Sequence, residues 1–345
     1  MEPLVSILIP AYNAQDWIGE TIESAIAQTW SRKEIIVVDD GSSDETLKIA
    51  RSFASKNVAV INQSNQGAAA ARNRAFSISQ GEFIQWLDAD DLISPNKISA
   101  QMARADEANA KQLLLSSGWA YFAYRPYRAR FVKSSLWRDL SPIEWLLRKL
   151  GENLHMQTAT WLVSRENTKA AGPWDTRLLG DDDGEYFCRV LLASRGTIFV
   201  PESKVYYRVT SGRRLSYIGQ SPRKMEAHFL SMQMHIKYIR SLEESERVRR
   251  ACVNYLRTWL PDFYVEGSEL VKLAQELAES LGGELKAPQF SWKYAWIQRV
   301  LGWTAARRTQ LHYNRIKCEI LRVWDKMMFR LQSCSGRRAG LGKLA

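Results

Sequence analysis

Three acidic clusters stand out in this sequence because of their residue types and their spacing. They are Asp39-Asp40-Gly41-Ser42-Ser43-Asp44, Asp88-Ala89-Asp90-Asp91 and Asp181-Asp182-Asp183. Carboxylate oxygens are hard ligands that suit Mg²⁺ or Mn²⁺, and such an ion can neutralise a diphosphate leaving group. A carboxylate can also act as a general base toward a hydroxyl group. The clusters are therefore candidates for an enzyme that holds a nucleotide, a divalent metal and an acceptor hydroxyl together.

The first two clusters gain interest from their position. They follow strand-like runs at residues 34–38 and 82–87, and ligands of open α/β sheets bind at the carboxyl ends of the strands. Acidic turns and helix caps are the ordinary alternative for such residues. For the third cluster, an Asp triplet at the start of a helix, stabilisation by the helix dipole is an equally simple explanation.

Strand and helix patterns alternate through the first part of the chain. Apolar runs predict strands at residues 4–9, 34–38, 58–61 and 82–87, and helical periodicity predicts helices at 16–28, 43–53, 68–79 and 95–109. We expect Asp16 to cap the first of these helices. Short connections between alternating elements indicate right-handed βαβ units and a mostly parallel sheet.

The pattern changes twice further along the chain. Predicted strands at 113–122, 158–163 and 197–208 alternate less regularly with helices near 141–150 and 183–194. This mixed region reads as a second lobe that completes the sheet. Past Pro222 only helical periodicity remains, so residues 221–345 are expected to form an all-helical C-terminal region.

Composition excludes several classes of protein. With 46% hydrophobic and 25% charged residues, the chain of 345 residues has the make-up of an ordered globular protein. No apolar run approaches the roughly 20 residues of a membrane-spanning helix, and the first residues lack a signal-peptide pattern. We therefore expect a cytoplasmic protein. The four cysteines are scattered, which predicts neither a disulfide framework nor a zinc site.

The net charge of +11 is concentrated at the C-terminal end. Residues 291–345 contain twelve Lys and Arg residues against Glu319 and Asp325, a local net charge of +10. Tryptophans are interspersed with these cations. The pattern is typical of a helix in an anionic membrane interface, which would place the protein at the inner face of the membrane. A plain helical bundle with solvated charges is the alternative, and nucleic acid is not expected because no binding module accompanies the basic residues.

The first hundred residues resemble the family 2 glycosyltransferases, whose nucleotide-binding domain has the GT-A fold. Five segments carry this resemblance in the family's order and spacing: residues 5–13 (VSILIPAYN), 24–29, 37–46, 65–73 and 81–91. The resemblance implies an inverting transfer of a sugar from a nucleotide-diphosphate donor, a UDP-sugar, to a hydroxyl of a glycan or lipid-linked acceptor. It implies Mn²⁺ or Mg²⁺ as cofactor. It also implies a GT-A domain with a nucleotide-sugar half at 1–110 and an acceptor half at 111–220.

The resemblance further implies which residues contact the donor. They are Pro10, Ala11, Tyr12, Asn13, Asp39, Asp40, Gly67, Arg72, Asp88, Ala89 and Asp90. Tyr12 and its neighbours would form a wall beside the nucleobase, and either Asp39 or Asp40 would accept a hydrogen bond from uracil or ribose. Arg72 would lie near the diphosphate. Asp90 would be the direct metal ligand, with Asp88 facing the ribose or the metal.

The third cluster aligns with the family's general base. Asp183 takes the position of that base and Asp182 that of its usual Glu neighbour, so Asp183 is the first candidate and Asp182 the second. A departure lies at Tyr207-Arg208-Val209-Thr210, where many members carry a His that adds a metal ligand. Arg213 and Arg214 would compensate as a diphosphate clamp, or else face solvent.

Two alternative functions use the same residues. A nucleotidyltransferase also employs strand-end acids and a metal, but it usually has a Gly-rich triphosphate loop near the first strand, and residues 10–13 offer none. A non-catalytic protein that binds sugar nucleotides or glycans would keep the donor site and lack a working base. Donor turnover distinguishes an enzyme from such a binder.

Overall fold

The computed structural model describes residues 2–107, 112–210, 221–264, 268–289 and 291–334. The chain begins with β1 (Val5–Ala11), α1 (Ile18–Ile26), β2 (Lys33–Asp39), α2 (Thr46–Ser52), β3 (Val58–Asn62), α3 (Ala68–Ile78), β4 (Phe83–Trp86), β5 (Leu92–Ile93) and α4 (Lys97–Glu107). It continues with β6 (Leu114–Phe122), η2 (Pro126–Arg128), α5 (Pro142–Gly151), η3 (Thr158–Thr160), β7 (Leu162–Ser164), α6 (Arg165–Ala171), α7 (Asp182–Leu192) and β8 (Thr197–Arg208). It ends with α8 (Pro222–Leu242), α9 (Glu246–Phe263), α10 (Glu269–Ser280) and α11 (Trp292–Cys334).

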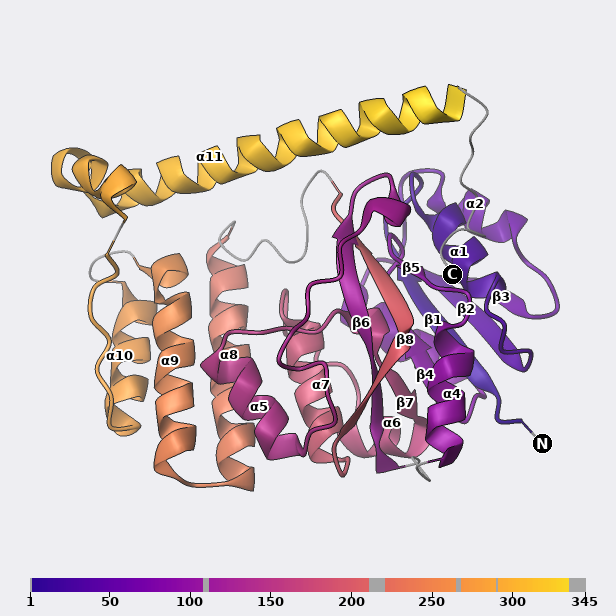
Figure 1. Cartoon of the computed structure of the whole chain (residues 1–345), viewed down its shortest axis with the longest axis horizontal. Helices are drawn as coiled ribbons and strands as arrows, with labels where there is room; N and C mark the ends of the chain where they lie inside the picture. The colour runs from indigo at the N-terminus through magenta and orange to yellow at the C-terminus, as the bar shows by residue number, and fades with distance from the viewer. Residues whose placement is uncertain (1, 108–111, 211–220, 265–267, 290, 335–345) are drawn as a thin grey trace.

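One eight-stranded sheet runs through the N-terminal two thirds of the chain, in the order β3-β2-β1-β4-β7-β6-β8-β5. The pairs β1·β2, β2·β3, β1·β4 and β6·β8 are parallel, whereas β7 and β5 pair antiparallel to their neighbours. The carboxyl ends of β1, β2 and β4 therefore lie along the same edge. The loops that hold the first two acidic clusters leave from that edge (Figure 1).

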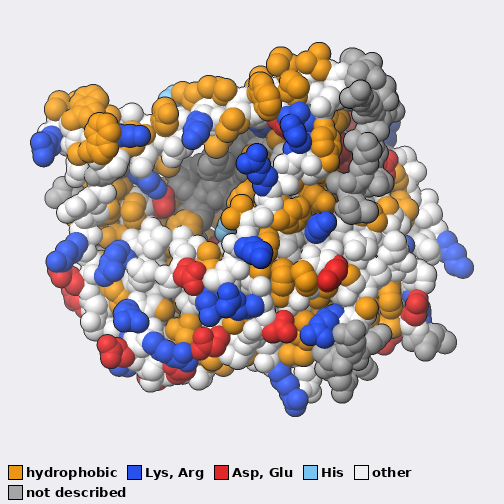
Figure 2. Space-filling model, viewed as in Figure 1, with side chains coloured by type: hydrophobic (Ala, Val, Ile, Leu, Met, Phe, Trp, Pro, Cys, Tyr) orange, Lys and Arg blue, Asp and Glu red, His pale blue; other side chains and the backbone are white. Residues whose placement is uncertain are grey.

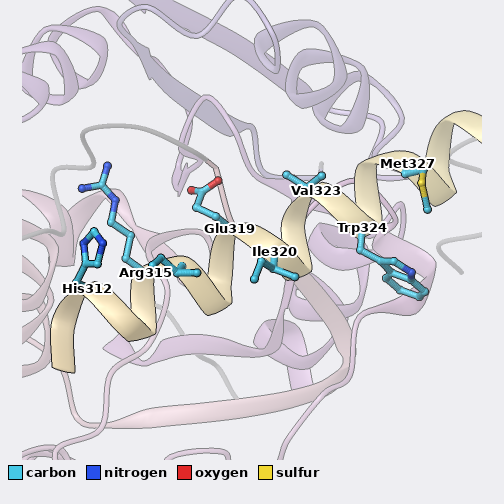
Figure 3. Close-up of a pocket in the computed structure, with 8 residues that line it drawn as sticks. His312, Arg315, Glu319, Ile320, Val323, Trp324 and Met327 are labelled. Carbon is cyan, nitrogen blue, oxygen red and sulfur yellow. The ribbon is translucent and has the colours of Figure 1, made fainter. Parts of the chain in front are cut away.

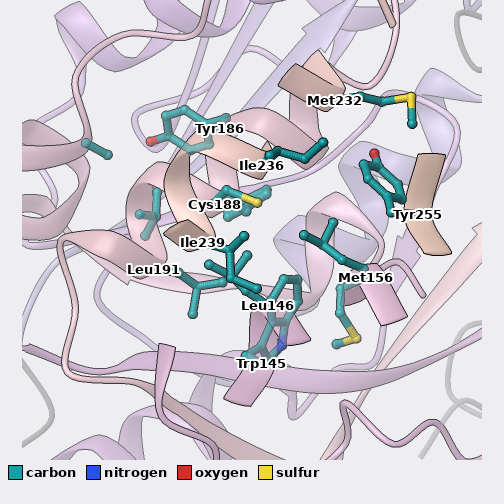
Figure 4. Packing of buried hydrophobic residues seen from close by; sticks show 14 of the residues in the cluster. Trp145, Leu146, Met156, Tyr186, Cys188, Leu191, Met232, Ile236, Ile239 and Tyr255 are labelled. Atoms are coloured by element: carbon teal, nitrogen blue, oxygen red, sulfur yellow. The ribbon is translucent and has the colours of Figure 1, made fainter. Parts of the chain in front are cut away.

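Both faces of the sheet are covered by helices, which explains the continuous apolar runs of its parallel strands. Successive residues of β1 alternate between two cores: Ile7 and Ile9 pack with α1 and α4, and Leu8 packs with α3. On the second face the core continues into the C-terminal helices. Figure 4 shows side chains from α5, α7, α8 and α9 meeting in this core, among them Trp145, Leu146, Tyr186, Leu191, Ile236 and Tyr255.

Helices α8, α9 and α10 stand side by side next to the sheet domain (Figure 1). A serine caps each of them: the side chains of Ser221, Ser245 and Ser268 accept hydrogen bonds from the backbone N–H groups three residues later. Because α8 packs on α7 and α9 packs on α5, the bundle shares its core with the sheet domain. It therefore acts as a wall of that domain.

Helix α11 crosses the top of the molecule in Figure 1, over both the bundle and the sheet domain. Gly302 interrupts it with φ +81°. Arg307 forms an ion pair with Asp262 of α9. Near its other end, Asp325 accepts hydrogen bonds from Tyr124 N and Arg125 Nε, next to η2. None of the described helices has the length and hydropathy needed to span a bilayer.

Two local expectations from the sequence were wrong, and two short elements were missed. Trp17, not Asp16, precedes α1 at the N-cap, and no side chain makes a cap hydrogen bond there. The run at 158–163 is a single turn of 3₁₀ helix followed by the short strand β7, because Gln157 and Thr160 form local hydrogen bonds. Helix α6 and the two-residue strand β5 were not expected.

Candidate active site

Arg72 joins the second and third acidic clusters. It lies in α3, whose alanines pack closely against β1 and β2, and its side chain is buried. Nη2 donates to Asp88 Oδ1 at 2.8 Å, and Nη1 donates to Asp182 Oδ2 at 2.6 Å. The guanidinium carbon lies 4.4 Å from the centroid of the Trp174 ring. Two carboxylates that are distant in sequence thus meet at one buried cation.

The turn η3 provides a second link between these clusters. Gln157 donates through Nε2 to Asp91 Oδ2, and its Nε2 lies 3.5 Å from Asp88 Oδ2. Thr158 Oγ1 donates to Asp183 Oδ2 at 3.2 Å. Neighbouring polar residues of one turn therefore contact acids of both clusters, which fixes the spacing between the clusters.

Asp183 has the electrostatics of a general base. Burial, reinforced by the negative charges of Asp182 and Asp181, raises the pKa of Asp183 to about 7. Its Oδ1 accepts a hydrogen bond from Gly184 N at 2.9 Å. A carboxylate with a pKa near neutrality can both accept a proton and release it again.

Asp181 begins α7 in an unusual conformation. Its φ is +57°, a left-handed value that is uncommon outside glycine, and its side chain makes no cap hydrogen bond. Instead Ser231 Oγ of α8 donates to Asp181 Oδ2 at 2.7 Å. Nδ1 of His228 lies 3.7 Å, and Nδ1 of His235 3.9 Å, from the same oxygen. The triplet is therefore anchored to the helical bundle, which argues against helix capping as the role of its first residue.

The surroundings of Asp181 favour its ionised form. Burial acts to raise the pKa of Asp181, but His235, Lys149 and His228 outweigh it and lower that pKa. Burial lowers the pKa of both imidazoles, that of His235 to about 4. The histidines are therefore neutral at pH 7, and Asp181 is ionised.

A cavity of about 30 Å³ separates Asp183 from α5. Its polar lining includes Lys149, His155 and Asp181, and Trp145 and Phe187 contribute apolar walls. A space of this size and polarity has room for a water molecule. The base candidate is thus in contact with a small polar interior space.

Asp40 is fully engaged within the protein. Its Oδ1 accepts from Gln63 Nε2 at 2.7 Å and from Gln66 N at 3.0 Å, and its Oδ2 accepts from Gly67 N at 2.8 Å. Gly67, with φ +93°, then starts α3. Asp40 therefore orders the loop that leads into the helix carrying Arg72.

Asp39 differs from Asp40 in having a spare acceptor. Its Oδ2 accepts from Ser42 N at 3.1 Å, whereas Oδ1 is buried and has no hydrogen-bond partner within the protein. An unpaired buried acceptor is costly in a folded protein and calls for a donor. Ligand binding offers such a donor.

The end of β1 places its residues in two different environments. Pro10 and Ala11 are buried in the sheet, and Tyr12 is 54% exposed. Asn13 adopts φ +48°, and its Oδ1 accepts from Ser43 N at 2.9 Å. Asn13 thus ties the end of β1 to the loop after β2, and the Tyr12 ring is left accessible beside it.

The loop after β4 is held by Arg208 at the end of β8. Arg208 Nε donates to Asp90 O, and its backbone N donates to Asp91 Oδ1, both at 2.7 Å. Thr21 Oγ1 donates to Ala89 O at 2.9 Å. Asp91 is completely buried, and that burial, with the charges of Asp90 and Asp88, raises its pKa well above the ordinary value. Asp91 is therefore a structural acid, and the partly exposed Asp90 and Asp88 remain as ligand candidates.

Among the described residues, no three Asp, Glu, His or Cys side chains are grouped so as to hold a metal ion. The sequence residues Asp88, Asp182, Asp183 and Arg72 meet at one site, and Asp39, Asp40, Asn13 and Gly67 meet at the adjoining ends of β1 and β2. Arg213 and Arg214 lie outside the described residues.

Sequence reasoning missed the residues that hold the acids in place. Gln157 and Thr158 carry no recognisable spacing signal, and Ser231, His228 and His235 lie in the bundle, far from the acids in sequence. The histidines share no metal-ligand spacing and read as ordinary packing residues. Arg208 lies in the segment 207–210, whose only sequence signal is the absence of the family's His. That signal does not indicate that Arg208 holds the loop after β4.

Comparison with known proteins identifies the first half of the chain. The sequence model of glycosyl transferase family 2 matches residues 6–166. The chain carries a family 2 glycosyltransferase domain. An uncharacterized glycosyltransferase of Rickettsia typhi is 39% identical over 131 residues, which is 38% of this chain and 41% of the relative. One of Haemophilus influenzae is 38% identical over 171 residues, 48% of this chain and 64% of the relative. The chain thus spans about two fifths of the first of these two curated relatives.

A solved structure extends the likeness to most of the chain. The crystal structure of residues 1–349 of TarS from S. aureus, in complex with UDP-GlcNAc, matches with a TM-score of 0.66. The match covers 90% of this chain and 91% of the crystallised TarS segment at 19% sequence identity. At this identity the likeness shows the fold alone. The family 2 domain and this fold confirm the expected α/β architecture of GT-A type with a C-terminal helical region.

Proposed function

We propose that this family 2 domain is an inverting glycosyltransferase that moves a sugar from a UDP-sugar to an acceptor hydroxyl. The observation that supports this most directly is that Arg72 forms ion pairs with both Asp88 and Asp182. It brings the donor-side acids and the base candidate Asp183 to one site. A transferase needs this proximity because donor carbon and acceptor oxygen must approach each other to react.

For the donor, we propose that Asp39 rather than Asp40 recognises the nucleobase. Asp39 Oδ1 has no partner, whereas both oxygens of Asp40 already accept hydrogen bonds. The imide N–H of uracil would satisfy Asp39, and the exposed Tyr12 ring can stack on a base. The neighbour TarS was solved with UDP-GlcNAc, which supports a uridine donor.

The diphosphate would lie beside Arg72. The guanidinium is already held between two carboxylates and over Trp174, so its orientation is set before the donor arrives. A planar guanidinium suits phosphate oxygens geometrically. The first residues of α3 offer further backbone N–H groups nearby, whereas those of Gln66 and Gly67 already donate to Asp40.

The residues present fit a divalent cation, and we propose that Asp90 and Asp88 hold it. Both are partly exposed carboxylates, separated by Ala89 in the loop after β4. Mg²⁺ typically takes one or two protein carboxylates, with substrate phosphates and waters completing its shell, so a cluster of three protein acids is not required. When bound, Mg²⁺ or Mn²⁺ would neutralise charge on the departing diphosphate.

We propose that Asp183 is the general base. It would take the proton of the acceptor hydroxyl while that oxygen forms a bond to the anomeric carbon and the bond from this carbon to the diphosphate oxygen breaks. Attack from the face opposite the diphosphate inverts the configuration. Asp182 is the weaker candidate because its Oδ2 accepts from Arg72.

The similar proteins do not indicate the acceptor, the division of the domain into two halves or the location of the protein. We propose a glycan or lipid-linked molecule as acceptor, with residues 1–110 binding the donor and 111–220 the acceptor. The helical region 221–345 would support both. The role of Arg213 and Arg214 as a diphosphate clamp and the cytoplasmic location stay predictions.

The function is tested by donor binding and turnover. A panel of nucleotide sugars is screened by thermal shift with and without Mn²⁺, and release of UDP is measured for each ligand that raises the melting temperature. Asp183→Asn is expected to abolish turnover and keep the thermal shift, whereas Asp16→Asn, an exposed control, is expected to match the wild type. Turnover by Asp183→Asn at the wild-type rate would exclude Asp183, and the absence of any UDP-sugar effect would exclude the function. A nucleotide triphosphate as the productive ligand would point to a nucleotidyltransferase.

A further inference from the structure

Helix α11 presents two opposite faces. Its inner face contacts the segment 124–127 of the sheet domain through Arg322, Asp325, Phe329 and Gln332. Its outer face carries Ile316, Ile320, Val323, Met327 and Leu331, spaced by three and four residues. At about 100° per residue, the two sets lie roughly half a turn apart. The apolar face of α11 is therefore directed away from the protein.

The outer face is an extended apolar surface. Its five residues are between 47% and 63% exposed, and Trp292, Trp296 and Val300 repeat the pattern before the Gly302 break. An open groove of about 530 Å³ follows the helix from His312 to Met327 (Figure 3). In Figure 2 hydrophobic side chains gather along the top edge of the molecule, which is α11. Contiguous exposed apolar surface of this kind marks a binding surface.

Charge indicates the occupant of this surface. The helix contains nine Lys and Arg residues and two acidic residues, a net charge of +7. Both acids are paired, Asp325 with Arg125 and Glu319 with Arg322. Arg308, Arg315, Lys317 and Arg330 are exposed cations. A second copy of the helix would bring like charges together, whereas an anionic surface would complement them.

The residue types favour lipid among anionic surfaces. Indoles and aliphatic side chains beside cations suit the boundary between acyl chains and headgroups. We infer that α11 is an interfacial helix that binds the protein to membranes containing anionic lipid. The apolar outer face enters the headgroup boundary, and the flanking cations contact lipid phosphates.

This surface is connected to the candidate active site. Arg208 holds Asp90 O and also donates to Ala123 O, and the next two residues, Tyr124 and Arg125, bind Asp325 of α11. If the proposed function is correct, the helix holds the site next to the lipid surface, which suits a lipid-linked acceptor. The membrane binding itself does not depend on that function.

The binding is tested by sedimentation of the full chain with vesicles. Vesicles of phosphatidylcholine with phosphatidylglycerol are compared with vesicles of phosphatidylcholine alone. We expect binding to the anionic vesicles to be at least about tenfold tighter and to weaken as salt is raised. Equal binding to both vesicle types, or none to either, would overturn the inference.

Paired variants locate the contact. Ile316→Ser with Ile320→Ser, and separately Arg315→Gln with Lys317→Gln, are expected to lose most of the binding. The matched controls are Val132→Ser with Leu273→Ser and Arg51→Gln with Lys56→Gln, which alter exposed residues outside α11. Melting temperatures verify that each variant is folded. Variants that bind like their controls would show that α11 is not the contact.

Two further readouts separate the alternatives. Light scattering after gel filtration reports the mass of the wild type. A dimer that dissociates in Ile316→Ser with Ile320→Ser, without vesicle binding, would assign the face to a second copy of this chain. Release of UDP with a soluble acceptor is expected to be unchanged in these variants, so failure of the membrane inference and failure of the proposed function give different results.

Discussion

Ser231 of α8 donates a hydrogen bond of 2.7 Å to Asp181, two residues before Asp183. The helical bundle thus holds the start of α7, where the general base candidate lies. Asp181 adopts a left-handed conformation, which persists only where surrounding contacts enforce it. The bundle therefore positions the base candidate as well as covering the sheet.

Ser231→Ala is expected to lower kcat several-fold while leaving the KM for the donor unchanged. The buried Asp181 oxygen would lose a hydrogen bond to a charged acceptor, which costs about 1.5–3 kcal/mol and loosens the turn before Asp183. Steady-state kinetics and thermal unfolding measure the two effects. Ser241→Ala, on the exposed side of the same helix, is the control, and Ser231→Thr should restore the rate. A loss of stability with unchanged kcat would limit Ser231 to a structural role.

The pH dependence of turnover should report Asp183. Since its pKa is raised to about 7, the carboxyl is protonated below this pH and cannot accept the acceptor proton. We expect kcat/KM to fall about tenfold per pH unit below 7 and to level off above it. A profile that is flat from pH 5.5 to 8.5 would contradict the assignment.

The same shift predicts how stability varies with pH. The folded pKa lies above the unfolded value, so between about pH 4 and 7 the folded state binds more protons than the unfolded state. The contribution of this group to the free energy of unfolding therefore falls as pH rises through that window. Asp183→Asn should remove this contribution and raise the melting temperature at pH 8. A melting temperature lower than that of the wild type at pH 8 would show that the ionised carboxylate is stabilised by its surroundings.

Arg72→Gln should remove donor binding and weaken the fold. It leaves Asp88 and Asp182 without their shared cation, and loss of one partner from a buried ion pair costs about 3–5 kcal/mol. Calorimetric titration with UDP and thermal unfolding test both parts. Arg74→Gln is the control, since Arg74 is an exposed residue of the same helix. Wild-type affinity for UDP in a folded Arg72→Gln protein would place the diphosphate elsewhere.

Asp39→Asn and Asp40→Asn should have different effects. An amide at position 39 replaces an unpaired acceptor with one oxygen and one donor, so affinity for UDP should fall about tenfold or more, with a small change in melting temperature. At position 40 the amide cannot accept all three existing hydrogen bonds, so stability should fall first. Titration with UDP and thermal unfolding of both variants make the comparison. The reverse pattern would assign nucleobase recognition to Asp40.

The sequence predicted the alternation of β1 to β4 with their helices because period and spacing are local properties. Through a family resemblance it also predicted that Asp40, Asp90 and Asp183 serve one site; the structure joins the second and third clusters through Asp88 and Asp182, which share Arg72. The parts it missed depend on tertiary contacts. Gln157 and Thr158 donate to Asp91 and Asp183, which are distant in sequence, and no local pattern indicates that Ser231 reaches Asp181.

The sequence also left the choice between Asp39 and Asp40 open. Both follow the same strand, and their surroundings differ only because the loop at residues 63–67 folds back onto Asp40. Likewise, the tail was recognisable as basic and amphipathic. Which face of α11 contacts the protein depends on its docking to segment 124–127, a contact across some two hundred residues of chain.

Because α11 is fastened at Asp262 on one side and at Arg125 on the other, it spans from the helical bundle to the sheet domain. A bilayer resting on this helix would stay about one helix diameter, 10–12 Å, above the protein below it. This spacing would select lipid-linked acceptors by length. An acceptor hydroxyl close to its lipid anchor could not reach Asp183, whereas a hydroxyl on a longer headgroup could.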